Sequence, residues 1–143
     1  MTYTLLIGQK SYSSWSLRGW LSLAPFDIEA KVEKVLIYSD SFYDDVAAFG
    51  AQRTVPALRT PEGGMLTDSL AIAWHVADGF KDRGVLPDSA VERAEAMSLI
   101  AEMHTGFTAL RGACPMNLRT AWAEFAPDDA VLADVARIEQ IWT

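Results

Sequence analysis

The order of its secondary-structure signals predicts an α/β amino-terminal domain followed by an all-α carboxyl-terminal domain. Through residue 80, short apolar runs suited to strands alternate with apolar residues at helical spacing. The segment 81–89 is rich in charge and contains a glycine and a proline, and helical spacing alone follows it. We therefore expect one domain over 1–80, a linker over 81–89 and a helical domain, present in part, over 90–143.

The first part begins as strand, helix, strand. The apolar run 4–8, closed by Gly8, predicts a buried strand, and the spacing of the next apolar residues predicts a helix over 14–24 that Pro25 ends. A second strand lies within 27–37, and its apolar residues are Val32, Val35, Leu36 and Ile37. A short helix then ends at Gly50.

A hairpin and a third helix complete this domain. Residues 54–59 predict a strand entered through Pro56, and a turn with a proline and two glycines leads to a second strand over 65–67. Asp68 and Ser69 then begin a helix that runs to about Phe80.

The second part is expected to be helical throughout. Three- and four-residue apolar spacing predicts one long helix over 90–112, and Asp128 and Asp129 begin a last helix after a break near Pro127. The sequence stops at Thr143 within a helical pattern, and two helices make a thin core. We therefore expect a fragment, or a chain that depends on a partner.

Composition narrows the classes of function. The 143 residues are 50% hydrophobic and 22% charged, which is ordinary for a soluble globular protein, and no apolar run approaches the roughly 18 residues of a membrane span. The amino terminus lacks the features of a signal peptide, so a cytoplasmic protein without a membrane partner is predicted. A net charge of −7 argues against nucleic acid, and one cysteine with two histidines argues against disulfides and metal sites.

A cluster of serines lies where the first strand gives way to the first helix, over residues 11–16. The start of a helix presents unpaired N–H groups and the positive end of its dipole, so an anion is stabilised there. Serines at such positions commonly cap the helix. Capping and catalysis both remain open on position alone.

This order of elements is that of a thioredoxin-like domain joined to a helical domain, and it resembles the soluble glutathione S-transferases. Residues 13–18, Ser-Ser-Trp-Ser-Leu-Arg, are similar to the Ser-Ser-x-Ser-x-Arg signature of the zeta class, which includes maleylacetoacetate isomerases. Val55-Pro56 stands where that fold has a cis-proline, and residues 67–72 resemble the start of its third helix. The resemblance implies that the last helices of the family are absent.

The resemblance also implies how glutathione would be bound. A cis bond at Pro56 would turn the N–H and C=O of Val55 outward to pair with the cysteinyl backbone, whereas a trans proline opening an edge strand is the competing interpretation. Ser69 suits the α-carboxylate of the γ-glutamyl group and Asp68 its ammonium, although both are also good helix caps.

The thiol of glutathione would lie at the serine cluster. A free thiol titrates near 8.5, and lowering that pKa by about two units requires about 2.7 kcal/mol. A hydroxyl donor and the helix start can supply this, and serine would act as a donor to the thiolate rather than as a base. The zeta signature assigns this role to Ser13, and Ser14 is the alternative because it is nearer the predicted helix start.

The second substrate is less defined. Trp15 replaces the cysteine of the zeta signature, which reshapes the pocket for the electrophile and makes isomerase activity doubtful. Residues 115–119 resemble the segment of the family that faces the substrate, so Arg111, Asn117 and Arg119 join Trp15 as pocket candidates. Ordinary surface arginines are the competing interpretation.

The sequence therefore predicts a glutathione transferase that uses glutathione as co-substrate and no metal, acts on a small electrophile and forms a homodimer. Two alternatives stay open: a non-catalytic binding or assembly module with the same fold, and a glutathione-dependent cis-trans isomerase. A thioredoxin-like oxidoreductase is disfavoured, because residues 13–16 contain no cysteine.

Overall fold

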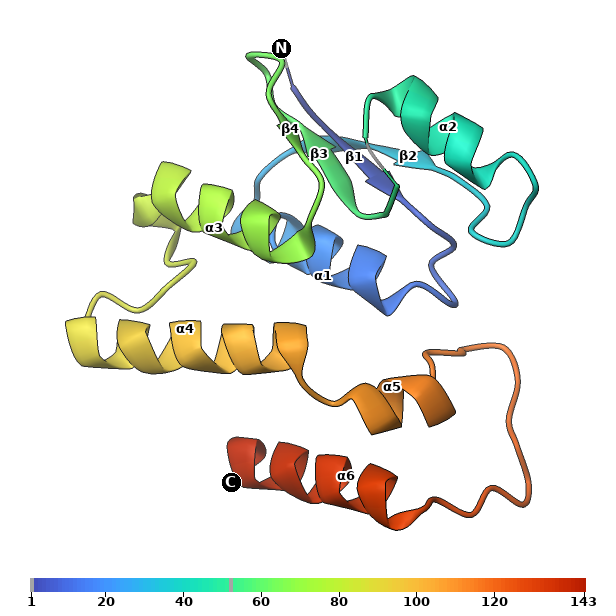
Figure 1. The fold of residues 1–143 in the computed structure, drawn as a ribbon. Coiled ribbons are helices and arrows are strands. Elements are labelled where there is room, and N and C mark those ends of the chain that lie inside the picture. Colours follow the sequence, from blue (N-terminus) through green and yellow to red (C-terminus); the bar gives the residue numbers. More distant parts are fainter. Residues whose placement is uncertain (1, 52) are drawn as a thin grey trace.

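A four-stranded sheet forms the centre of the amino-terminal part (Figure 1). The computed structural model describes residues 2–51 and 53–143. The strands are β1 (Tyr3–Ile7), β2 (Ala30–Lys34), β3 (Ala57–Arg59) and β4 (Met65–Leu66), in the order β2-β1-β3-β4. β1 is parallel to β2, whereas β3 is antiparallel to both β1 and β4. This confirms the predicted thioredoxin-like arrangement of strand, helix, strand, followed by a hairpin.

Helices cover both faces of the sheet and create two apolar cores. α1 (Ser14–Leu21) and α3 (Ser69–Gly79) pack on one face, and α2 (Phe42–Phe49) packs on the other (Figure 1). Successive side chains of a strand point to opposite faces, so Leu5 and Ile7 join the core under α1 and α3, whereas Leu6 joins the core under α2. Burial on both faces explains why the run 5–7 is continuously apolar.

Several predicted boundaries are wrong by a few residues. α1 ends at Leu21 rather than residue 24, and a 3₁₀ turn, η1 (Ala24–Phe26), takes up the proline. β2 ends at Lys34, before three of the four apolar residues expected in it. Of these, Val35 is buried and donates to the Ile7 carbonyl at 2.9 Å, while Leu36 is 60% exposed. The strand expected over 54–59 begins at Ala57, and the Val55–Pro56 peptide before it is cis.

The helical region departs further from expectation. A 3₁₀ turn, η2 (Lys81–Arg83), leads to α4 (Ala90–Thr105), α5 (Thr108–Ala113) and α6 (Asp129–Trp142). The single helix predicted over 90–112 is therefore wrong, because it breaks at Gly106 and Phe107. Gly106 is extended, and Phe107 adopts a left-handed φ of 60° with its side chain buried. The break turns α5 away from the axis of α4 and packs it against α6 (Figure 1).

Polar contacts join the three helices of this region. Arg137 of α6 donates two hydrogen bonds to the Glu102 carboxylate of α4, at 2.6 and 2.8 Å. The N–H of Leu110 donates to Asp134 Oδ2 at 2.9 Å, which caps α5 from α6. Among the residues described, we find no helix with the length and apolar content needed to cross a bilayer.

Candidate functional site

Gly8 lies where the end of β1, the start of α1 and the loop before β3 meet. A Cβ placed on Gly8 would lie 2.5 Å from Ile37 Cγ2, 3.2 Å from Ser13 Cβ and 3.4 Å from Val55 Cγ2. The first distance is too short for any side chain larger than hydrogen. The absence of a side chain at Gly8 thus lets Ser13 and Val55, which are 42 positions apart in sequence, approach the same point.

A second glycine brings Pro56 against α1. A Cβ on Gly19 would lie 2.7 Å from Pro56 Cβ and 2.8 Å from Pro56 Cγ. The ring of Pro56 therefore packs directly on the backbone of α1. This is possible because Gly19 has no side chain at the point of contact. The contact fixes the position of the Val55–Pro56 segment relative to α1.

Ser13 is the N-cap of α1 and its hydroxyl is fully engaged. Its Oγ accepts from the Ser16 N–H at 3.2 Å and donates to Ser16 Oγ at 2.7 Å. Ser16 Oγ in turn accepts from the Gly8 N–H at 2.9 Å. Both serines are buried, and together they link the end of β1 to the first turn of α1. Ser16 was not singled out from the sequence, although its three-residue spacing from Ser13 is the spacing of a cap.

Ser14 is the first residue of α1 and is half-buried. Its hydroxyl makes no hydrogen bond within residues 2–51 and 53–143. As the first residue of α1 it lies at the positive end of the helix dipole. A hydroxyl that is free to donate therefore lies beside the buried Ser13–Ser16 pair.

Val55 offers backbone groups for an added strand. It precedes β3 and lies outside the sheet ladder. Within the part of the chain that the structure describes, neither its N–H nor its C=O has a hydrogen-bond partner. An extended peptide could pair with both, which is the chemistry of strand addition.

Asp68 and Ser69 lie at the start of α3, as predicted. Asp68 is the N-cap, and its Oδ1 accepts from the N–H of Leu70 at 2.7 Å and of Ala71 at 3.4 Å. Ser69 is buried, and its hydroxyl has no hydrogen-bond partner among the described residues. The second oxygen of Asp68 is thus not used by the cap, and it lies 3.6 Å from His104 Nε2.

Trp15 lies at the contact between the sheet domain and the helices, where two arginines lie against its indole. The guanidinium carbon of Arg18 is 4.3 Å from the ring centroid and that of Arg111 is 4.7 Å away. The ring of His104 meets the same indole edge-on at 5.5 Å. The side chain at position 15, predicted to face the electrophile, therefore also joins α1 to the helical region.

Both arginines hold the end of α4. Arg18 donates to the Met103 carbonyl at 3.2 Å, and Arg111 donates to the carbonyls of Met103 and His104. These carbonyls are the unpaired acceptors of a helix end, where the dipole is negative and cations are stabilised. Burial, and next the charge of Arg111, lowers the pKa of Arg18.

The segment that contains Asn117 and Arg119 touches the serine loop. The N–H of Leu118 donates to the carbonyl of Ser11 at 3.0 Å. Asn117 Oδ1 accepts from the N–H groups of Arg119 and Thr120, at 3.0 and 3.1 Å, so its side chain shapes the turn. The side chain of Arg119 is exposed. The fold thus brings this segment to the edge of the candidate site.

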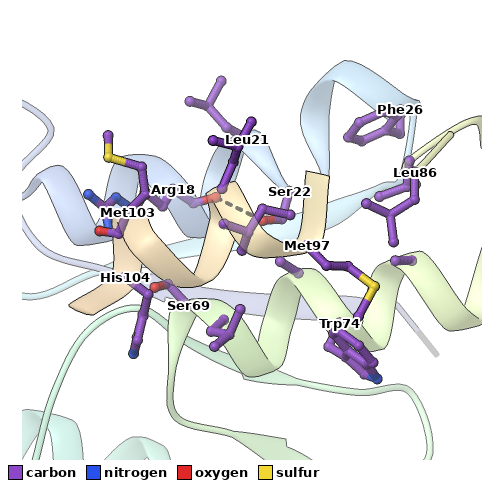
Figure 2. A pocket seen from close by; sticks show the side chains of 16 residues that line it. Arg18, Leu21, Ser22, Phe26, Ser69, Trp74, Leu86, Met97, Met103 and His104 are labelled. Atoms are coloured by element: carbon purple, nitrogen blue, oxygen red, sulfur yellow. Dashed lines mark hydrogen bonds between the residues drawn. The ribbon is translucent and has the colours of Figure 1, made fainter. Parts of the chain in front are cut away.

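A separate apolar cavity of about 460 Å³ lies between α1, α3 and α4 (Figure 2). Arg18, Ser69 and His104 lie toward one end of it, and Phe26, Leu86, Met97 and Trp74 toward the other (Figure 2). Trp15, Arg111, Asn117 and Arg119, the four residues predicted for the electrophile pocket, are not part of its lining. The cavity adjoins the site at the start of α3 rather than at the serine cluster.

No metal centre is formed by the residues described: they contain no group of three or more histidine, cysteine or acidic side chains within reach of one ion. Ser16 and His104 also lie at the candidate site, although neither was predicted from the sequence as a site residue. Only the fold brings His104 to Asp68.

Residues 12–78 match the family model described as glutathione S-transferase, N-terminal domain. The matched stretch runs from the serine cluster to the end of α3, and it includes Val55, Pro56, Asp68 and Ser69. No curated protein matches the chain.

Solved glutathione transferases share the fold. Glutathione transferase Omega 2S from Trametes versicolor, in complex with 2,4-dihydroxybenzophenone, has a TM-score of 0.69 at 22% identity, over 100% of this chain and 64% of that one. The Tau class enzyme of mango, Mangifera indica, has a TM-score of 0.64 at 18% identity, over 98% and 59% of the two chains. A glutathione transferase homologue from Burkholderia gl BGR1, with bound glutathione, has a TM-score of 0.63 at 23% identity, over 79% and 59%.

These likenesses establish the glutathione transferase fold: a thioredoxin-like sheet domain and a helical region. The chain spans about 64% of the length of the first of these structures and 59% of the other two.

Proposed function

We propose that this chain binds glutathione and forms part of a glutathione transferase that activates the thiol with a serine hydroxyl at the start of α1. The observation that carries the proposal is the meeting at Gly8 of the serine cluster with Val55, within a segment that matches the glutathione S-transferase amino-terminal domain. The bound glutathione in the Burkholderia homologue supports the choice of ligand.

In this proposal, glutathione lies extended between the starts of the two helices. The N–H and C=O of Val55 pair with the cysteinyl backbone as an added strand would. The γ-glutamyl carboxylate lies at the N–H and free hydroxyl of Ser69, where the dipole of α3 stabilises an anion. The γ-glutamyl ammonium pairs with Asp68 Oδ2, the oxygen that the helix cap leaves unused.

Ser14 is the better supported donor to the thiolate. The Ser13 hydroxyl already donates to Ser16 Oγ, and using it for the thiolate would break a buried hydrogen bond. Donation from the Ser14 hydroxyl to the thiolate would break no hydrogen bond of the described residues. Together with the N-terminal N–H groups of α1, it stabilises the thiolate relative to the thiol, which lowers the pKa of the bound cysteine and raises the fraction of the reactive form.

The second substrate is proposed to reach the sulfur beside Trp15 and the segment that carries Asn117. The indole supplies an apolar surface, and the nearby guanidinium groups of Arg18 and Arg111 favour an electrophile that develops negative charge as the thiolate attacks. A zeta-like subtype, an isomerase reaction, a homodimer and a cytoplasmic location stay predictions from the sequence.

The experiment is a titration of the glutathione thiol bound to the full chain, followed by the ultraviolet absorbance of the thiolate. The Ser14→Ala variant is expected to raise the thiol pKa toward its free value and to slow conjugation of a chlorinated nitrobenzene by about 10- to 100-fold. Ser11→Ala, which changes a neighbouring hydroxyl outside α1, is the matched control. An unchanged pKa in Ser14→Ala would remove the proposed role of this residue.

A non-catalytic module with the same fold is the second candidate. The side chains of Trp74, Trp122 and Trp142 are 54%, 75% and 82% exposed, and exposed aromatic residues are typical of protein interfaces. Calorimetry with glutathione separates the two candidates. Heat of binding with no conjugation, in chain that unfolds cooperatively, would favour a glutathione-binding module, and no heat at millimolar glutathione would favour an assembly module.

A further inference from the structure

We infer that His104 is a positioning residue whose charge controls how strongly Asp68 binds the ammonium group of glutathione. The inference rests on the proposed function, because it concerns the same ligand and the same carboxylate. It assigns a role to a side chain of the helical region, outside the segment that matches the family model.

The two oxygens of Asp68 have different partners. Oδ1 is held by the first turn of α3, at 2.7 Å from the Leu70 nitrogen. Oδ2 lies 3.6 Å from His104 Nε2, within ion-pair distance but beyond a hydrogen bond. The Asp68 side chain is about half exposed, so a ligand can also reach Oδ2. Oδ2 of Asp68 can therefore interact with the His104 imidazole on one side and with a ligand from solvent on the other.

His104 is held in place by groups other than Asp68. It lies in the last turn of α4, and its ring packs edge-on against Trp15 at a centroid distance of 5.5 Å. Arg111 donates to its backbone carbonyl and also contacts Trp15. The Trp15 contact packs the imidazole, and the Arg111 hydrogen bond holds the backbone that carries it, so neither contact depends on Asp68.

Of the positively chargeable groups in this cluster, only the His104 imidazole ordinarily changes its charge between neutral and mildly acidic pH. Asp68 faces it from α3, and the guanidinium groups of Arg18 and Arg111 lie against Trp15 from α1 and α5. Arginine stays protonated throughout the neutral and mildly acidic range, whereas histidine is the side chain that ordinarily changes charge there. Within residues 2–51 and 53–143, no lysine or arginine forms an ion pair with Asp68.

Protonation of His104 therefore competes with the ligand. An imidazolium neutralises Oδ2 and repels the incoming ammonium, whereas a neutral imidazole leaves the full carboxylate charge for glutathione. The coupling is reciprocal, so bound ammonium disfavours the imidazolium. Glutathione is expected to bind more tightly at neutral pH than in mild acid.

The test is the dissociation constant of S-methylglutathione, measured by calorimetry on the full chain. Its methylated sulfur does not titrate, so the proposed shift of the thiol pKa adds no pH dependence of its own. Between about pH 7.5 and about pH 5.5, binding by the wild-type chain is expected to weaken about five- to tenfold, because acid favours the imidazolium that competes with the ligand ammonium for Asp68. The His104→Gln variant is expected to lose this change. His75→Gln is the matched control, since His75 is bonded to the Tyr3 hydroxyl at 3.0 Å and should leave the change intact.

An analogue, S-methylglutathione without the γ-glutamyl amine, tests the same point from the side of the ligand. Its binding to the wild-type chain is expected to be nearly independent of pH over this range, because no ammonium competes with His104. Thermal unfolding establishes that each variant is folded, and His104→Asn is a second neutral replacement if glutamine fits the site poorly.

Each outcome bears on one proposal or the other. A pH dependence that persists in His104→Gln or His104→Asn, that disappears in His75→Gln, or that is equally strong for the analogue overturns the role of His104 and leaves the proposed function standing. Folded wild-type chain that binds no glutathione at either pH overturns the proposed function, and the inference falls with it.

Discussion

The hydroxyl of Ser13 donates a 2.7 Å hydrogen bond to Ser16 Oγ, which also accepts from the Gly8 N–H. This contact divides the serine cluster between two tasks. Ser13 and Ser16 fasten the start of α1 to the end of β1, and both are buried. The Ser14 hydroxyl makes no hydrogen bond in the part of the chain that the structure describes. The capping role and the free hydroxyl, which are indistinguishable in the sequence, thus fall on different residues of the same motif.

Ser13→Ala should lower the free energy of unfolding of the chain more than Ser14→Ala does. Removal of an N-cap costs about 0.5–2 kcal/mol of unfolding free energy, whereas Ser14→Ala should change it by less than about 0.5 kcal/mol. Urea unfolding of the two variants measures this directly. The opposite order of stabilities would show that Ser14, not Ser13, carries the structural role.

Ser16→Ala should be more damaging than Ser13→Ala. It leaves the Gly8 N–H and the Ser13 hydroxyl, both at a buried junction, without their acceptor, and an unsatisfied buried donor costs about 1–3 kcal/mol. Because the two serines share one network, the double variant should lose less stability than the sum of the single variants. Full additivity, measured by the same urea unfolding, would contradict the shared network.

Gly19→Ala should displace the glutathione-binding segment. The new methyl group would lie 2.7 Å from Pro56 Cβ, so the Pro56 loop or α1 must shift, at a cost of about 1–3 kcal/mol. The proposed strand-like pairing at Val55 should weaken with it, which calorimetry with glutathione would detect.

Gly112→Ala is the matched control for this substitution. Gly112 is also a helical glycine, in α5, but a Cβ there meets no atom within 4 Å. Alanine is expected to stabilise the helix by up to about 1 kcal/mol, because it loses less backbone entropy than glycine. Equal destabilisation by both substitutions would mean that the Gly19–Pro56 contact has no special importance.

The sequence predicted the sheet domain well because its signals are local. The run 5–7, the hairpin turn and the Asp68 cap each specify one element, and their order is enough to indicate the thioredoxin-like fold. Strand β2 was harder to bound, since Val35 is buried beyond its end and its burial resembles that of a strand residue. Boundaries depend on backbone pairing, which a pattern of apolar residues does not specify.

The break between α4 and α5 could not be predicted from periodicity. The apolar spacing continues through Phe107, yet a Cβ on Gly106 would lie 2.8 Å from the Glu102 carbonyl oxygen and Phe107 is left-handed. An isolated glycine within a helical pattern is compatible with a helix. The Phe107 ring is buried at the break, and such a tertiary contact has no signal in local periodicity.

In the candidate site, too, local motifs are visible in the sequence and long-range contacts are not. Ser69, Val55 and Asp68 could be placed by their motifs, whereas His104 reaches Asp68 across 36 positions of sequence. Arg111 was predicted to face the substrate, but most of its described contacts are with Trp15 and the end of α4. Long-range contacts of this kind have no signal in the local sequence.

The contact between α4 and α6 should weaken in acid. The hydrogen bonds from Arg137 hold the pKa of Glu102 below its ordinary value; burial opposes them, and the attraction of the Arg137 charge adds a smaller effect in the same direction as the hydrogen bonds. A group whose pKa is lowered by folding stabilises the fold above its unfolded pKa, about 4.3 for glutamate, and that stability is lost as pH falls through the lower folded pKa. Arg137 stays charged throughout this range.

Glu102→Gln should therefore lower the melting temperature at neutral pH and make little difference well below about pH 4, where the wild-type carboxyl is itself protonated. Glu95→Gln is the control, because Glu95 is an exposed glutamate of the same helix that forms no ion pair within the described residues. Thermal unfolding of the three proteins across the acidic range measures the effect. A Glu102→Gln deficit that is the same at neutral and acidic pH would assign the loss to packing rather than to the Glu102–Arg137 pair.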